Sequence, residues 1–122
     1  MIESDIRIIE AEPFFPVAKA RVPLKFGAVV VESLPFCHVR VMAENRLGAR
    51  AEGWGAMFLM DLWAWPVSPV PHEKRSAAMI ETARRLCRLY AEHGEFGHPI
   101  ELFLRLEPQF QKIARSVCEE MA

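Results

Sequence analysis

Hydrophobic and polar residues alternate in three stretches of the first half of the chain, as strands with one covered face require. Residues 5–12 alternate around three isoleucines until Pro13, and they predict a short strand. Residues 29–44 open with three valines and then alternate, which predicts a second strand. A turn that includes Gly48 leads to residues 49–56, which return as the hairpin partner and predict a third strand.

Two apolar segments interrupt or follow these strands and contain many prolines. Residues 13–28 hold three prolines and a glycine, which argue against a helix or a regular ladder and predict a long loop. Residues 57–71 contain two tryptophans, three prolines and a single charge, Asp61, and predict a second loop of unusually apolar composition. Long loops inside a compact domain are usually lids or binding loops.

The second half of the chain has the three-and-four spacing of amphipathic helices. Residues 72–93 carry this spacing, with Pro71 suited to the first turn and Gly94 to the C-terminal cap. A short helical segment is expected from Pro99, followed by a last helix that starts at Pro108. Three strands followed by helices indicate an α+β fold.

Composition narrows the possible functions. The chain has 122 residues, about half of what a complete (β/α)8 barrel needs. Fifteen basic residues against sixteen acidic ones leave no excess for nucleic-acid binding, and no apolar run is long enough to span a membrane. Three widely spaced cysteines and an acidic N-terminus without a signal sequence favour the cytoplasm. Hydrophobic residues make up 52% even without glycine, which indicates a surface that something else covers.

The polar residues predict no catalytic or metal site. The four histidines lack partners at zinc-ligand spacing, the serines lack a nucleophile context, and Cys87 and Cys118 fit core positions. Glu10 and Glu12 share one strand face and fit a solvated surface. The aromatic and methionine residues of the two loops remain, and they form either a small core beneath the loops or a surface that closes over another domain or a ligand.

Several of these stretches together resemble a known domain. The strand IRIIEAEPF, the segment RVPLKFG, the strand FCHVRV and the motif GWG are similar in order and spacing to the N-terminal capping domain of the enolase superfamily, in its mandelate racemase/muconate lactonizing enzyme branch. The resemblance implies a three-stranded antiparallel sheet followed by helices. These form one capping domain over residues 1–122, with strands in 5–56, the apolar loop 57–71 and helices in 72–122. It also implies a C-terminal (β/α)8 barrel that is absent from this chain.

The resemblance further implies which of the two domains contributes which functional residues. Catalysis and Mg²⁺ binding belong to the missing barrel of an isomerase or lyase, and this chain contributes no catalytic or metal-binding residue. Loops 14–28 and 55–66 close over the substrate, which implies a lid of Phe26, Met57 and Phe58. An interface, with the chain's own barrel or within a homo-oligomer, is expected at four aromatic residues: Phe14, Phe15, Trp63 and Trp65.

One position departs from the family pattern. Many relatives have Glu directly after the Gly-aromatic-Gly motif, where this chain has Ala56. Because of Ala56, the resemblance assigns neither a mechanism nor catalytic activity to the longer enzyme that would contain this domain. The alternative function is a stand-alone α+β module that binds a partner or dimerises through its apolar loops and has no enzymatic activity.

Overall fold

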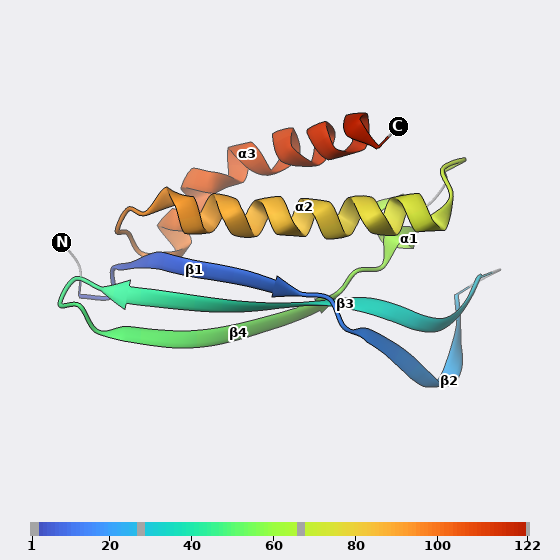
Figure 1. Ribbon diagram of the computed structural model, residues 1–122, viewed down its shortest axis with the longest axis horizontal. Coiled ribbons are helices and arrows are strands. Elements are labelled where there is room, and N and C mark those ends of the chain that lie inside the picture. Colours follow the sequence, from blue (N-terminus) through green and yellow to red (C-terminus); the bar gives the residue numbers. More distant parts are fainter. Residues whose placement is uncertain (1–2, 27–28, 66–67, 122) are drawn as a thin grey trace.

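The protein is an α+β structure in which a four-stranded antiparallel sheet precedes the helices (Figure 1). The computed structural model describes residues 3–26, 29–65 and 68–121. Its elements are β1 (Ile6–Phe14), β2 (Val17–Phe26), β3 (Val29–Asn45), β4 (Arg50–Phe58), α1 (Asp61–Ala64), α2 (His72–His93) and α3 (Pro99–Glu120). The predicted class is therefore confirmed, whereas the predicted count of three strands is wrong by one.

The long strand β3 organises the sheet. Its second half pairs with β1 on one side and with β4 on the other, and its first half pairs with β2. β1 and β2 follow the same side of β3 in succession, with Phe14 opposite His38 and Val17 opposite Pro35. The first half of β3 and β2 thus form a two-stranded ribbon, here called the arm, that extends beyond β1 and β4 (Figure 1).

The arm corrects the prediction of a loop over residues 13–28, because most of this segment is β2. A strand can contain Pro23 here because β2 is an edge strand and the pairing register shifts between Lys19 and Leu24, where the ladder is interrupted. The prolines therefore mark an irregular edge strand and not a loop.

The second apolar segment, residues 57–71, is also more ordered than predicted. β4 extends to Phe58, and residues Asp61–Ala64 form the short helix α1 before the chain reaches α2. The prediction of an uninterrupted loop is therefore wrong for the part of this segment that the structure describes.

The helical half agrees more closely with the sequence pattern. α2 spans residues 72–93 as predicted, and Gly94 caps it in the left-handed conformation with φ 67°. The two expected segments after Pro99 form one continuous helix, α3, with Pro108 inside it. Pro108 lacks the N–H that would bond to the carbonyl of Leu104, but Leu104 is exposed and water can satisfy that carbonyl.

The core lies between these layers. α2 packs mainly against β1, and α3 packs antiparallel to α2, its C-terminal half drawn on the side of α2 away from the sheet (Figure 1). The buried apolar residues of α3 are Leu102, Leu106 and Val117. On α2 Cys87 is buried as predicted, whereas Cys118 of α3 is exposed, which corrects its assignment to the core.

Candidate functional site

A buried carboxylate fixes the apolar segment that follows β4. Asp61, the first residue of α1, is only 3% exposed. Its Oδ2 atom lies 2.9 Å from Nδ1 of His72 and 3.0 Å from Nε of Arg75, both on the first turns of α2. A buried carboxylate must be paired to be tolerated. The one charge of this segment therefore anchors α1 to α2.

The anchor leaves one tryptophan of the segment in solvent. Trp63 is 79% exposed, although it lies only two residues after the buried Asp61. Trp65 is half-buried and borders a small groove with Ala78 of α2 and Met121. Its carbonyl accepts a 3.4 Å hydrogen bond from Nη1 of Arg75. The two tryptophans that the sequence groups together thus differ, because Trp65 packs within the chain and Trp63 does not.

The arm exposes further apolar side chains beside this segment. Val17, Val22, Leu24 and Val30 are all exposed. A two-stranded ribbon is marginally stable in water without a covering layer. The arm and α1 lie at the same end of the sheet (Figure 1). The exposed apolar residues at this end lie on both faces of the sheet, and we call them together the apolar end: Val17, Val22, Leu24, Val30, Phe58 and Trp63.

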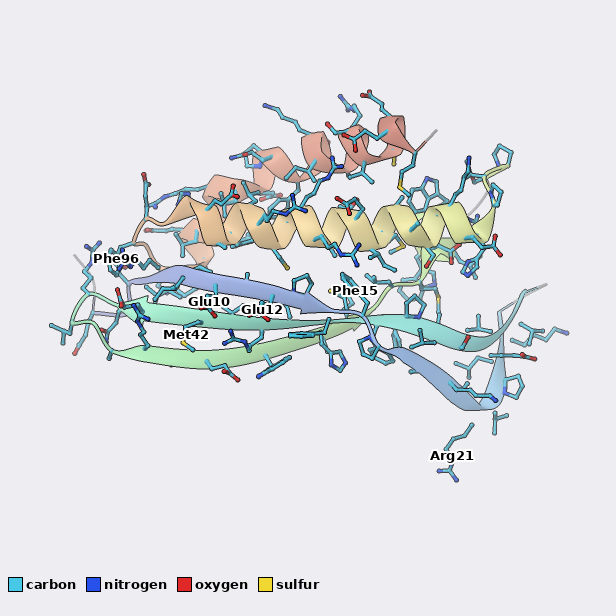
Figure 2. All side chains as sticks on the ribbon, viewed as in Figure 1. Glu10, Glu12, Phe15, Arg21, Met42 and Phe96 are labelled. Carbon is cyan, nitrogen blue, oxygen red and sulfur yellow. The ribbon has the colours of Figure 1, made fainter. Side chains whose placement is uncertain are left out.

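A shallow groove joins the arm to β4 at this end. Its volume is about 220 Å³, and Leu24, Leu34, Phe36 and Phe58 are among the residues that line it. The rings of Phe36 and Phe58 pack with centroids 4.5 Å apart, while Phe58 remains 52% exposed. Figure 2 shows Arg21, which lies next to Val22 in β2, at the bend of this strand and directed away from the rest of the molecule.

The remaining lid and interface candidates lie apart from one another. Met57 is exposed and lies opposite Cys37 on the helix-facing side of the sheet, whereas Phe58 lies on the other side with Phe36. Phe14 packs against Trp54 at 5.7 Å, and Phe15 lies under the guanidinium of Arg84 at 5.2 Å. The side chain of Phe26 lies outside the described residues.

A second, larger hollow lies between the sheet and α2. It has a volume of about 450 Å³ and an almost wholly apolar lining that includes Val39, Val41, Met57, Leu86 and Tyr90. Both buried thiols, Cys37 and Cys87, also line it. Burial, with a smaller contribution from Cys37, raises the pKa of Cys87 to about 11. Such a thiol is protonated at neutral pH and is a poor nucleophile.

The opposite face of the sheet carries charge. Arg40 of β3 forms ion pairs with Glu10 and Glu12 of β1 and with Glu52 of β4 (Figure 2 labels Glu10 and Glu12). Hydrogen bonds to Glu12 and Glu10 raise the pKa of Arg40. Because all three carboxylates are about half exposed and share one arginine, this is a solvated face, as the sequence indicated for Glu10 and Glu12.

Three of the four histidines lie beside polar partners. His72 pairs with Asp61, and Nδ1 of His98 accepts a hydrogen bond from the backbone N–H of Ile100 at the start of α3. His93 lies 3.9 Å from Glu95. Within residues 3–26, 29–65 and 68–121, no three His, Cys, Asp or Glu side chains converge as metal ligands would. Over the same residues, no helix combines the length and apolarity needed to cross a bilayer.

Sequence reasoning missed two parts of this surface. The strand formed by the valines of β2 was missed because the neighbouring prolines predicted a loop. Valines interspersed with Lys19, Arg21 and Lys25 fit a two-stranded ribbon in solvent. The anchoring role of Asp61 was also missed. Its signal was present, since a lone charge in an apolar run usually has a buried partner.

Comparison with known proteins adds no assignment. No protein family model matches the chain, and neither a curated protein nor a solved structure matches it.

Proposed function

We propose that this chain is the N-terminal capping domain of a Mg²⁺-dependent enzyme that resembles the mandelate racemase/muconate lactonizing enzyme branch of the enolase superfamily. The observation that carries the proposal is the apolar end, where the arm, β4 and the α1 segment expose valine, leucine, phenylalanine and tryptophan side chains at the same end of the sheet. Exposed apolar patches of this kind mark interaction surfaces. A barrel mouth is a surface that such an end could close.

The proposed role is that of a lid. The apolar end would exclude water from the substrate and shape the pocket, while the barrel would supply the acid–base residues. Mg²⁺ would stabilise the enediolate formed when a proton is removed next to a carboxylate. Its ligands would come from the barrel. The cytoplasm is the expected location.

Of the three lid residues inferred from the sequence, Phe58 has the strongest support. It lines the groove that joins β4 to the arm, and half of its surface is open. Met57 faces the hollow under α2 instead. Phe58 is therefore the better single probe of the lid.

A first experiment is to sequence the gene downstream of codon 122. A continuation of about 250 residues with alternating strand and helix patterns would support the capping role. A stop codon would contradict it and would favour the alternative of a stand-alone interaction module.

The lid role itself is tested by Phe58→Ala in the longer enzyme. Losing a pocket contact should lower kcat/KM about 10- to 200-fold while the melting temperature changes little, because the ring is already half exposed. Phe103→Ala on α3 is the matched control, since Phe103 is 44% exposed and lies away from the apolar end. Unchanged kinetics for Phe58→Ala, or a large fall in melting temperature, would contradict the lid assignment.

A further inference from the structure

The edges of the sheet are protected against pairing to different degrees. β1 carries Pro13 and a register shift between Ile8 and Glu10, and α2 packs against it. β2 carries two lysines, Pro23 and a register shift. The free edge of the first half of β3 is flanked by the α1 segment, since Met60 and Leu62 share a groove with its residues. Prolines, charged side chains (lysine above all), bulges and covering segments are the devices by which proteins prevent edge-to-edge association.

Of these devices β4 has only two charged residues, Arg50 and Glu52, near its N-terminal end. Its nine residues pair with β3 without a register shift, its sequence RAEGWGAMF contains neither proline nor lysine, and every residue is exposed. Among the described residues, β4 pairs with β3 alone. A long, flat and exposed edge strand is a template for a further strand.

The glycines of β4 show that the surrounding space is open. A Cβ atom added at Gly53 or Gly55 would meet nothing within 4 Å. Close packing inside this chain therefore does not account for these glycines. The backbone of β4 is accessible both at its edge and at the two glycines.

We propose that a second copy of this chain pairs with β4, antiparallel and about a twofold axis through Trp54. Trp54 is the midpoint of Arg50–Phe58, so this register pairs all nine residues of one β4 with all nine of the other. The sheets of the two copies would become continuous through the new pair of strands. This proposal goes beyond the proposed function and does not depend on it.

The side chains of β4 are self-complementary in this register. On the charged face Trp54 meets its own copy, and Arg50 lies opposite Phe58, an arrangement that suits a cation–π contact. Glu52 lies opposite Ala56, so no like charges oppose each other. On the other face the glycines oppose each other, and the long Met57 lies opposite the small Ala51.

The salt bridges already present are compatible with this arrangement. Nε of Arg50 donates a 2.9 Å hydrogen bond to Glu44 within the same chain. Glu52 accepts hydrogen bonds from Arg40 and from the indole nitrogen of Trp54. These bonds hold the charges of Arg50 and Glu52 on one face of the sheet, clear of the edge backbone that the second copy would use.

Disulfide trapping tests both the association and its register. In a Cys118→Ser background, which removes the exposed thiol, Trp54→Cys should form a covalent dimer on mild oxidation with diamide. Residues directly opposite each other across strands have Cβ atoms about 4.5–5.5 Å apart, close enough for a disulfide after small adjustments. Glu52→Cys is the control, because its two copies would lie about 14 Å apart along the strands.

Sedimentation of the unmodified chain completes the test. We expect a concentration-dependent dimer that Trp54→Lys converts to monomer by placing two lysines opposite each other. Trp63→Ser with Trp65→Ser should leave this dimer intact. A monomer at all concentrations, equal cross-linking at positions 54 and 52, or a dimer lost through the Trp63 and Trp65 changes alone would overturn the proposal.

Discussion

Asp61 offers the sharpest test of how the apolar segment is held. Asp61→Asn keeps the size of the side chain and removes its charge. Arg75, whose side chain is only 13% exposed, would then be left without its carboxylate at 3.0 Å. Breaking a buried ion pair by changing one partner costs about 3–5 kcal/mol. For a domain of this length, that loss corresponds to a fall in melting temperature of roughly 10–20 °C.

A double-mutant cycle separates the pair from other effects of the change. Arg75→Met alone should also be destabilising, because it leaves the Asp61 carboxylate buried with His72 as its remaining ion-pair partner among the described residues. The double variant Asp61→Asn, Arg75→Met should lose much less free energy of unfolding than the sum of the two single variants, since no buried charge remains. Urea unfolding followed by far-UV circular dichroism measures all four proteins.

The surface pair Glu101 and Arg105 provides the matched control. It is separated by 3.6 Å on α3, and both side chains are about half exposed. Glu101→Gln should cost no more than about 0.5 kcal/mol. The anchoring argument fails if Asp61→Asn is as mild as this control, or if the two changes at Asp61 and Arg75 are simply additive.

Two further predictions follow from burial and from charge. Leu106→Ala should cost about 2–5 kcal/mol in urea unfolding because Leu106 is 2% exposed, whereas Leu104→Ala, at a position 57% exposed on the same helix, should cost far less. Hydrogen bonds from Arg50 and Arg7 lower the pKa of Glu44 in the folded protein, so its stabilising effect is present above the ordinary glutamate pKa and is lost as the pH falls through the lowered value. Glu44→Gln should therefore weaken the dependence of the melting temperature on pH in the acid range, and an unchanged dependence would contradict this.

The helices and the paired strands were predictable because their signals are local. Pro71 and Gly94 bracket a periodic run, and α2 occupies the residues between them. β1 and β4 lie within two residues of the predicted strands at each end. In α3 the rule that proline marks the first turn of a helix gave the wrong boundary. Pro108 lies inside the helix instead, at an exposed position where water can replace the lost hydrogen bond.

The arm could not be predicted by the same means. Strand prediction depends on one face being covered, and both Val17 and Val22 of β2 are exposed. Its prolines fit an edge strand only once the register shift between Lys19 and Leu24 is known. β2 and the first half of β3 are consecutive in the sequence and pair from Phe26 and Val29 onward, so the prolines, and not a distant partner, obscured this strand.

The candidate site was predicted in composition but not in arrangement. The surplus of hydrophobic residues indicated an exposed apolar surface that another domain or molecule would bury. The structure has exposed apolar side chains on the arm, on β4 and on α1. The sequence could not show that Asp61 turns inward while Trp63 turns outward, because this depends on where His72 and Arg75 lie in space.

Phe58 connects the two proposed surfaces and therefore determines how their tests are combined. It ends β4, where it would face Arg50 of a second copy, and it also lines the groove beside the arm. A kinetic defect of Phe58→Ala could thus arise from a damaged lid or from a weakened dimer. Trp54→Lys resolves the two causes, because Trp54 lies on the proposed twofold axis and does not line that groove. If the lid acts independently of the β4 edge, Trp54→Lys will abolish dimerisation and preserve kcat/KM, whereas equal kinetic losses in both variants would mean that the second copy supports the lid.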